Sequence, residues 1–563
     1  MPVLREAALP LVAYRLPWDH RVALGNFRST DAEYNSAIPG RDQNLVFPVF
    51  PFLVLHYSPP MLFNSYGFIF AFLPVALLGF FALGRYASPR VALGWMALSS
   101  LFFYGYWKPI YLLLLLFSIG FNFTAGLCAS GRLTPSPQAR RVALFLGVLV
   151  NLGLLGYFKY ANFFVDQANS LFATPFHLDA IFLPLAISFF TFQQIAYLVD
   201  AYRGYAQEHH FIDYCLFVTF FPQLIAGPIV HHRDMMPQFA ASSCRFDSDS
   251  FARGLSYFVL GLFKKVVIAD SLARFGSPVF DSVAGGGAPT LFEAWSGVLA
   301  YTGQIYFDFS GYSDMAIGLG LLIGIHIPVN FNSPYKATGI ADFWRRWHIT
   351  LSQFLRDYLY IPLGGNRKGP SRRYVNLMLT MLLGGLWHGA GWTFVVWGGL
   401  HGLYLVINHG WGHLRPRLFA NAPRCPERFL GRTFTLLAVI LGWVYFRANS
   451  AHSAHRMIAG MLGANGISVS DNLRPLLGFL ERFGVAFTGT GSFDSDGLAW
   501  VVAAFVIALV VPNTQQYLSR KGYESPSWLA WKPNAAHALF LAVLALCALV
   551  RLKEVREFLY FQF

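Results

Sequence analysis

Long apolar stretches, repeated along almost the whole chain, restrict the possible folds more than any other feature of this sequence. A straight helix needs about 20 apolar residues to cross a bilayer, so the shorter stretches must be tilted, buried in a bundle or re-entrant. Residues 290–328 are long enough for one to two passes. We therefore expect an all-α, polytopic membrane protein with about a dozen transmembrane or re-entrant helices. The stretches cover residues 63–84, 92–107, 110–127, 142–158, 177–199, 211–230, 254–270, 290–328, 374–388, 392–408, 430–446, 497–511 and 535–551.

The composition excludes an ordinary soluble fold. Hydrophobic residues make up 55% of the chain and charged residues only 12%, whereas a soluble domain has about 25% charged residues. A soluble protein of this size with so few charges would leave much of its apolar surface in contact with water. The same hydrophobic composition also excludes disordered and collagen-like chains. Membrane lipid is therefore the first expected partner.

Membrane topology explains the excess of basic residues, and nucleic-acid binding is not expected. Lys and Arg number 42 against 28 Asp and Glu, which gives a formal net charge of +14. Basic residues collect in the cytoplasmic loops of membrane proteins, and no nucleic-acid-binding module is visible. We expect residues 160–176 and 485–496, which contain no Lys or Arg, to lie outside the cell. The segments expected in the cytoplasm are 85–90, 129–141, 366–373 and 415–432.

Residues 1–60 differ from the rest of the chain. They contain five Arg and five acidic residues, and no basic segment is followed by the apolar run of a signal peptide. The charge rule nevertheless places residue 61 outside the cytoplasm. We therefore expect residues 1–60 to be a non-native or disordered extension, with translation beginning at Met61. Residues 61–563 are expected to form a single transmembrane domain.

A cluster of charged and aromatic residues predicts an amphipathic helix over residues 341–358. Asp342 and Arg346 are spaced i, i+4, so they form an ion pair on one face of such a helix. A helix with both Arg and Trp suits the membrane interface. His348 is expected on its apolar face, which comprises Trp344, His348, Leu351 and Leu355.

A second cluster places His388 among four glycines, within residues 384–392, at the end of an apolar stretch. Glycine permits irregular backbone and the close approach of another molecule. At membrane depth, irregular backbone is tolerated only inside the protein or along a polar cavity. A histidine here could exchange a proton with a substrate. The residue type alone leaves open a second interpretation, a packed histidine bonded to a backbone carbonyl.

Other polar groups lie in apolar surroundings between residues 304 and 314. This segment contains Gln304, Asp308 and Asp314. It could line a substrate path, or Asp308 could be a structural partner of Arg345. Residues 222–228, with a proline at each end, predict a break in the helix and a re-entrant segment.

The remaining histidine pairs do not predict a metal site. Adjacent histidines point apart on a helix, and no carboxylate accompanies the i, i+4 pair. The nucleophile-elbow, P-loop and dinucleotide-binding motifs are also absent from the sequence. The pairs in question are His209–His210, His231–His232 and His409–His413.

The two histidine-containing clusters belong to an ordered series of motifs. The series is LPLAISFFTFQ (183–193), QLIAGP (223–228), FWRRWHITLS (343–352), RDY (356–358), LGGNR (363–367) and LWHG (386–389). It resembles the signature of the membrane-bound O-acyltransferase family, most closely its bacterial alginate O-acetylase branch. Residues 61–65, MLFNS, resemble the usual opening of that family. Ala186 stands where Gly is expected, and we expect this difference to affect packing only.

The resemblance implies a central tunnel and the transfer of an acyl group from a cytoplasmic thioester, typically acetyl-CoA, to a hydroxyl. His388 is then the catalytic histidine and acts as general base, a role that typically contributes 10²–10⁴-fold to the rate. His348 is expected near the cytoplasmic mouth of the same tunnel, where it orients a substrate or stabilises the oxyanion. No bound cofactor is implied. The residues expected to bind donor or substrate are Gln304, Asp308, Trp344, Arg345, Arg346, Asn366, Arg367, Lys368 and Trp387.

The resemblance also implies a location in the bacterial inner membrane and extracytoplasmic partners, namely a periplasmic acetyltransferase and polysaccharide export proteins. The acceptor could be alginate, cellulose, peptidoglycan, another exported glycan, or a serine of a partner protein. Two other functions remain open. A transporter or flippase for an acylated carrier predicts internal repeats, which are not visible. A non-catalytic scaffold of an export complex predicts that both histidines can be lost without effect.

Overall fold

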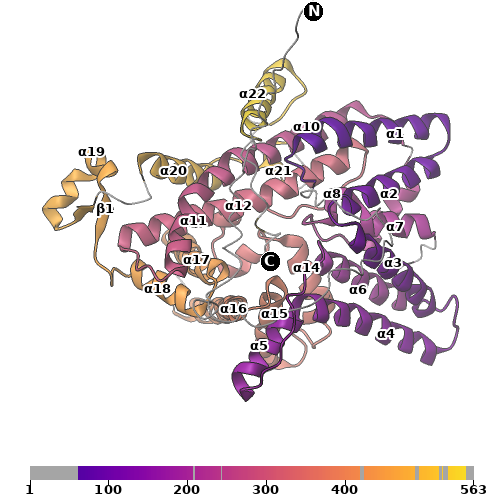
Figure 1. Cartoon of the computed structure of the whole chain (residues 1–563), viewed down its shortest axis with the longest axis horizontal. Coiled ribbons are helices and arrows are strands. Elements are labelled where there is room, and N and C mark those ends of the chain that lie inside the picture. The colour runs from indigo at the N-terminus through magenta and orange to yellow at the C-terminus, as the bar shows by residue number, and fades with distance from the viewer. Residues whose placement is uncertain are drawn as a thin grey trace, which may run out of the picture. The chain divides into compact units, whose positions relative to one another are not determined.

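A single long helix, α12 (Leu291–Leu322), forms the core of the bundle. The computed structural model describes residues 61–206, 210–242, 244–418, 424–488, 494–518, 523, 530–552 and 559, and the expectation for residues 1–60 lies outside them. The apolar stretch 290–328, which was long enough for one to two passes, forms the single helix α12 followed by a loop. From Ala294 onward almost every residue of α12 is buried, because α10, α11, α17, α18 and α20 pack around it (Figure 1).

Helices α10 (Ser248–Phe263) and α12 approach so closely that only glycine fits at their contact points. A methyl group added to Gly254 would lie 2.8 Å from the carbonyl oxygen of Gly318. One added to Gly311 would lie 2.8 Å from the carbonyl oxygen of Gly261. These two pairs show that the helices run antiparallel. Small residues at such contacts are typical of helix packing in membranes, where dispersion forces act over short distances.

The other described elements confirm an all-α fold. The first half contains α1 (Leu73–Tyr86), α2 (Pro89–Gly105), α3 (Pro109–Ala129), α4 (Pro137–Leu155), α5 (Ala161–Phe172), α6 (Ile187–Tyr202), α7 (Phe211–Thr219), α8 (Phe221–Leu224), α9 (His232–Ala241) and α11 (Asp270–Ala284). Wider π-helical turns occupy Phe68–Phe72, Gly156–Tyr160, Lys264–Ala269 and Arg356–Tyr360.

The second half contains α13 (Ile340–Trp344), α14 (Ile349–Leu355), α15 (Gly369–His388), α16 (Trp392–Leu418), α17 (Arg424–Arg447), α18 (Ala451–Met461), α19 (Arg474–Leu477), α20 (Ser495–Leu509), α21 (Thr514–Tyr517) and α22 (Ala535–Arg551). Short 3-10 turns cover Pro334–Lys336, Asp471–Leu473 and Gly478–Phe483. Strands β1 (Ser468–Ser470) and β2 (Ala486–Thr488) form one short parallel pair in the described chain.

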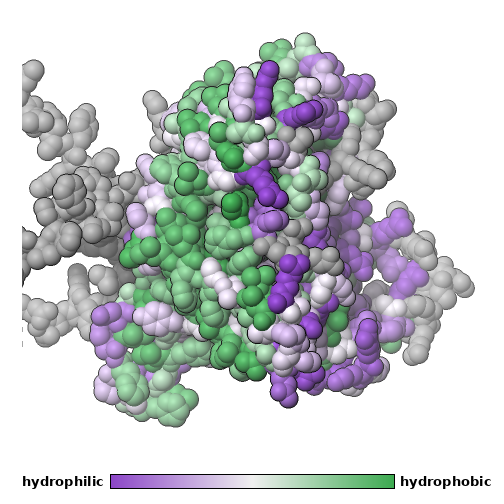
Figure 2. All heavy atoms as spheres, turned by 90° about the vertical axis from the view of Figure 1, so that its right-hand side faces the viewer, coloured by the Kyte–Doolittle hydropathy of each residue, from purple (hydrophilic) through white to green (hydrophobic). Residues whose placement is uncertain are grey.

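The outer surface of α1 to α4 is apolar, as a lipid-facing surface must be. Figure 2 shows a broad hydrophobic area on this side, with polar residues gathered toward its margins. Leu78, Phe117 and Phe145 are among the exposed side chains, at 71%, 56% and 65% of their full accessibility. A soluble monomer rarely exposes a continuous apolar area of this extent.

Four helices in the described residues are long and apolar enough to cross a membrane by length and composition: Phe68–Tyr86, Pro109–Ala129, Pro137–Phe172 and Glu427–Arg447. The other expected spans correspond to segments that are shorter, less apolar or more charged. Residues 177–199 are helical only from Ile187. The stretch 211–230 breaks after α8, and residues 225–231 run irregularly through the interior. The helix break predicted for 222–228 is therefore confirmed.

The continuous helix predicted over residues 341–358 is wrong. Helix α13 ends at Trp344, and α14 begins at Ile349. Between them His348 adopts a left-handed conformation, with φ of 42°. The predicted ion pair between Asp342 and Arg346 does form, at 2.8 Å. The break at His348 separates Arg345 and Arg346, which precede it, from the apolar Leu351 and Leu355 of α14.

The alanine at position 186, where glycine is expected, affects the backbone as well as packing. The expectation of an effect on packing only is therefore wrong. The φ of Ala186 is 62°, a left-handed conformation at the start of α6. This conformation costs an L-residue about 1–2 kcal/mol, whereas glycine adopts it freely. We expect Ala186→Gly to raise the free energy of unfolding by about 1 kcal/mol, measured by denaturant titration of the purified protein. Ala196→Gly, in the right-handed interior of the same helix, should lower it by about 1 kcal/mol. Destabilisation by both changes would contradict the argument.

Candidate active site

The fold brings His388 and His348 side by side, although 40 residues separate them in the sequence. Their ring centroids are 6.4 Å apart. His388 is the last residue of α15 and is 4% exposed, while His348 precedes α14 and is fully buried. A substrate atom between the two rings could contact both. His348 therefore lies beside His388, deep in the protein.

Asn330 fixes the orientation of the His348 ring. Its Oδ1 lies 3.1 Å from His348 Nδ1 and accepts hydrogen bonds from the backbone N and the Oγ1 of Thr350. Because a backbone N–H can only donate, the Asn330 atom must be the oxygen, and His348 Nδ1 must carry a proton. In the neutral ring, Nε2 then holds the lone pair. Sequence reasoning missed Asn330, since a lone Asn between two apolar stretches carries no distinctive signal.

Aromatic rings enclose His388. Its ring centroid lies 4.9 Å from that of Trp387, 5.1 Å from that of Trp397 and 5.3 Å from that of Phe446. Trp387 itself stacks on Phe192, at 5.1 Å. The rings exclude water from the imidazole, so electrostatic interactions with a reacting group are stronger there than in water.

A further buried histidine, His401, lies in the same aromatic layer and was missed by sequence reasoning. It is on α16, one turn after Trp397, and its ring centroid is 4.8 Å from that of Trp397 and 5.2 Å from that of Trp344. Neither ring nitrogen has a hydrogen-bond partner among the described residues. Trp344, predicted to bind substrate, therefore reaches this layer. The i, i+4 spacing of Trp397 and His401 was the available signal.

Comparison with known proteins decides the family. The model of the membrane-bound O-acyltransferase family matches residues 146–448, which include His348, His388 and His401. The chain belongs to the membrane-bound O-acyltransferase family.

Two curated relatives of this acyltransferase match most of the chain, and a third matches about half of it. A peptidoglycan O-acetyltransferase of Helicobacter pylori is 42% identical over 532 residues, covering 89% of this chain and 98% of the relative. A probable alginate O-acetylase of Pseudomonas aeruginosa is 40% identical over 539 residues, covering 89% of this chain and all of the relative. A teichoic acid D-alanyltransferase of Streptococcus thermophilus is 29% identical over 287 residues, covering 46% of this chain and 68% of the relative. The predicted family, fold class and acyltransferase activity are confirmed.

In this O-acyltransferase, two acids of α12, Asp308 and Asp314, are paired with lysines of the adjoining segment. Asp308 lies 2.7 Å from Lys265, which also contacts Asp270 at 2.8 Å. The suggested partner of Asp308, Arg345, is wrong, because Arg345 is exposed at the turn after α13. Asp314 pairs with Lys264 at 2.6 Å. These ion pairs join α12 to the π-helical turn Lys264–Ala269.

The other residues predicted to bind the acyl donor lie on three different elements: α12, the turn after α13 and the loop 366–373. Gln304 is buried on α12, one turn before Asp308. Arg346 donates to Asp342, and its Nη1 donates to the Asn332 carbonyl at 3.3 Å. Asn366, Arg367 and Lys368 are exposed, and Asn366 accepts a hydrogen bond from the Tyr360 hydroxyl.

A cluster of cations, here called the basic collar, surrounds Thr338 at the expected cytoplasmic side. It consists of Lys336, Arg346, Arg415, Arg428 and Arg432, against the carboxylates of Asp342 and Glu427. Thr338, Arg415, Glu427 and Arg428 line a polar cavity of about 300 Å³. Burial lowers the pKa of Lys336, and the neighbouring Arg346 and Arg432 lower it further. This crowding of like charges favours an anion in the collar.

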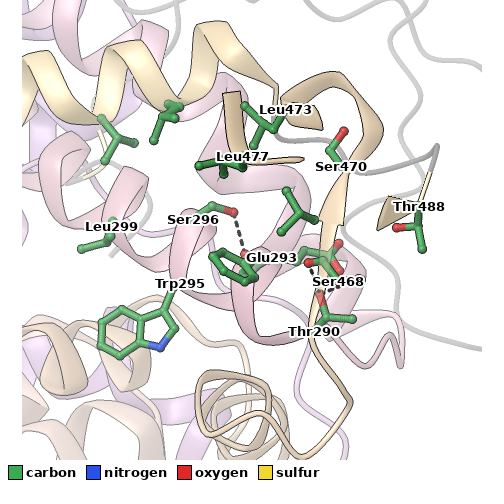
Figure 3. A pocket seen from close by; sticks show the side chains of 14 residues that line it. Thr290, Glu293, Trp295, Ser296, Leu299, Ser468, Ser470, Leu473, Leu477 and Thr488 are labelled. Carbon is green, nitrogen blue, oxygen red and sulfur yellow. Dashed lines mark hydrogen bonds between the residues drawn. The ribbon is translucent and has the colours of Figure 1, made fainter. Parts of the chain in front are cut away.

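A separate cavity of about 380 Å³ lies between α12, β1 and α20 (Figure 3). Its walls are mainly apolar, including Trp295, Leu473 and Leu477, and Glu293 is its one ionisable residue among those described. Ser296 Oγ donates to the Glu293 carbonyl at 2.8 Å. None of the predicted site residues lines this cavity.

Proposed function

We propose that this protein transfers an acetyl group from acetyl-CoA, or a similar cytoplasmic acetyl thioester, to hydroxyl groups of an exported polysaccharide. The observation that carries the proposal is the pair of buried, adjacent histidines, 6.4 Å apart, in a chain about 40% identical to O-acetyltransferases. Relatives named for alginate and peptidoglycan support an exported glycan as acceptor. The acetyl group reaches it directly or through a serine of a periplasmic partner.

In the proposed reaction, His388 removes the proton from the acceptor hydroxyl as its oxygen attacks the thioester carbonyl carbon. The carbonyl oxygen becomes an oxyanion, and a ring N–H of His401 donates a hydrogen bond to it, while His348, whose Nε2 holds a lone pair, orients a substrate. The C–S bond then breaks, and the leaving thiolate takes the proton from His388. The products are an O-acetyl ester and a free thiol. No oxidant, metal or bound cofactor enters the balance.

The position of the basic collar supports an elongated donor with an anionic head. Trp397 touches His388, and Arg415 lies 18 residues further along α16, which corresponds to about 27 Å at 1.5 Å per residue. A donor that reaches both needs a phosphate-bearing head and a long flexible arm ending in the acyl group. Coenzyme A thioesters have this form, and the guanidinium groups suit phosphate oxygens.

We place the protein in the bacterial inner membrane as a multi-pass protein, with the collar in the cytoplasm. The apolar helices and the family support a membrane location. The outer end of α15, at His388, then faces a route to the periplasm. Export proteins and a periplasmic acetyltransferase are the proposed partners.

Inverted membrane vesicles, whose cytoplasmic face is outside, test the function. Vesicles containing the protein receive radiolabelled acetyl-CoA, and base-labile label in non-dialysable glycan is counted. We expect incorporation above that of vesicles without the protein. If the intact cells contain acetylated glycan but the vesicles incorporate no label from acetyl-CoA, acetyl-CoA is not the donor.

Collar substitutions test the donor site. We expect the double change Arg428→Gln and Arg432→Gln to raise KM for acetyl-CoA about 10-fold or more, because charge-assisted contacts to phosphates are lost. The value of kcat should change little, since Arg428 and Arg432 lie at least 14 residues, about 21 Å along α17, from Phe446 beside His388. The matched control is Arg367→Gln with Lys368→Gln, two exposed cations of the loop 366–373. A larger increase in KM for the control pair would place the donor head at that loop instead.

A further inference from the structure

A lysine within an apolar membrane helix needs an explanation, and Lys159 is such a residue. It lies in the candidate span Pro137–Phe172, at the π-helical turn Gly156–Tyr160. Lys159 directly follows the expected apolar stretch 142–158, and a partly buried lysine amine is costly there unless polar groups satisfy it. Wide π-helical turns are also frequent at functional sites.

Lys159 and Tyr160 bind three successive carbonyls at the end of α15. Lys159 Nζ donates to the Trp387 carbonyl at 2.5 Å and to the His388 carbonyl at 3.2 Å. The Tyr160 hydroxyl donates to the Leu386 carbonyl at 2.7 Å. The last carbonyls of any helix lack partners within the helix. A cation there is also favoured by the helix dipole.

The π-helical turn explains how two neighbouring residues reach one helix end. Successive side chains on an α-helix diverge by about 100°, so they normally contact different neighbours. Here the wider turn lets Lys159 and Tyr160 both reach α15. Tyr157, in the same turn, is instead exposed at 56%. Lys159 Nζ also donates to Ser188 Oγ on α6, at 3.3 Å.

The backbone after His388 provides little restraint of its own. Gly389 ends α15 in an extended conformation, with φ of −161° and ψ of 150°. A methyl group at Gly389 would overlap the Phe394 ring, so a stiffer residue cannot replace this glycine. The position of the His388 imidazole therefore depends on what holds its carbonyl and those of the two residues before it.

We propose that Lys159 and Tyr160 are positioning residues that hold the end of α15 and so aim the His388 imidazole at the reacting hydroxyl. The proposal rests on the catalytic role of His388 proposed above. Neither residue touches the substrate. Misplacing a catalytic group by about 1 Å can cost 10²-fold in rate.

The kinetic test uses Lys159→Met, which keeps the length of the side chain but removes its charge and its donors. In inverted vesicles with radiolabelled acetyl-CoA, we expect kcat to fall about 10²-fold while KM stays within about 2-fold. Lys159→Arg, which retains charge and donors, should recover kcat to within about 10-fold of the unmodified protein. Tyr160→Phe should lower kcat about 3- to 10-fold, for one lost hydrogen bond. The matched control, Tyr157→Phe, should leave both constants unchanged.

A spectroscopic measurement separates this proposal from the proposed function. The protein is labelled at histidine with carbon-13 and nitrogen-15 and studied in lipid by solid-state NMR, and His388→Gln identifies the His388 signal. We expect Lys159→Met to shift or broaden that signal, and Tyr157→Phe to leave it in place. An unchanged His388 signal in Lys159→Met would overturn the positioning role. A shifted signal, with full activity in His388→Gln, would support positioning and reject His388 as the base.

Discussion

Changing His388 to alanine is expected to lower acetyl transfer by at least 10²-fold, because the reacting hydroxyl loses its proton acceptor. The measurement is base-labile acetyl in glycan from inverted vesicles that contain equal amounts of each variant. The imidazole is enclosed by Trp387, Trp397 and Phe446, so water reaches the reacting hydroxyl poorly and replaces the lost base inefficiently. His348→Ala is expected to reduce transfer less, because it removes orientation while leaving the base.

The controls for His388 distinguish chemistry from folding. His388→Gln keeps most of the side-chain volume within the aromatic cage but cannot accept a proton as imidazole does. It should lose activity while its amount in the membrane stays normal. His413→Ala, on the exposed end of α16, should have no effect. Near-normal transfer by His388→Gln would reject the assigned base and support a non-catalytic role for this residue.

The sequence predicted the class of fold because the bilayer sets its main requirement. Apolar length and scarce charges identify membrane helices directly, since an unpaired backbone group in lipid is too costly. The proline-flanked break at 222–228 was also visible, because proline removes a donor and obstructs the preceding turn. The ion pair of Asp342 and Arg346 followed from spacing alone.

Contacts between distant segments could not be predicted in this way. The break at His348 depends on Asn330, whose Oδ1 holds the ring, while its carbonyl accepts from Ile349 N at 3.0 Å. Periodicity over 341–358 favours one helix, and only the distant loop containing Asn330 overrides it. Lys159 likewise appears in the sequence as an isolated charge directly after the apolar stretch 142–158. Its role follows only once the end of α15 is placed beside it.

The pairing of Asp308 with Arg345, one of two interpretations that the sequence left open, is wrong for a related reason. Charge alone allows many pairs. The glycine contacts between α10 and α12 bring the turn Lys264–Ala269 next to Asp308 instead. Lys265 is thereby buried to 1% exposure between two carboxylates. This arrangement leads to a second large effect, on stability.

Lys265→Met is expected to lower the free energy of unfolding by about 3–5 kcal/mol, because it leaves buried carboxylates without a counter-charge. The side chains of Asp308 and Asp270 are 3% and 13% exposed, so water can stabilise neither charge well. This loss is a large part of the 5–15 kcal/mol that typically stabilises a protein. The measurements are denaturant titration of the purified protein and its abundance in membranes at equal synthesis.

A compensating variant separates the buried charge from lost packing. Adding Asp308→Asn to Lys265→Met removes one unpaired charge while keeping the shape of the side chain. The asparagine side chain at position 308 can still make hydrogen bonds through its Oδ1 and Nδ2. In the unmodified protein the Leu559 backbone N donates to Asp308 Oδ2 at 3.1 Å, and the asparagine Oδ1 can replace that acceptor. The double variant should therefore be more stable than Lys265→Met alone, despite carrying two changes. Lys368→Met, at an exposed loop position, should change stability by less than about 0.5 kcal/mol. If the double variant were less stable than Lys265→Met, packing of the lysine stem would be the larger contribution, and the uncompensated charge would not explain the loss.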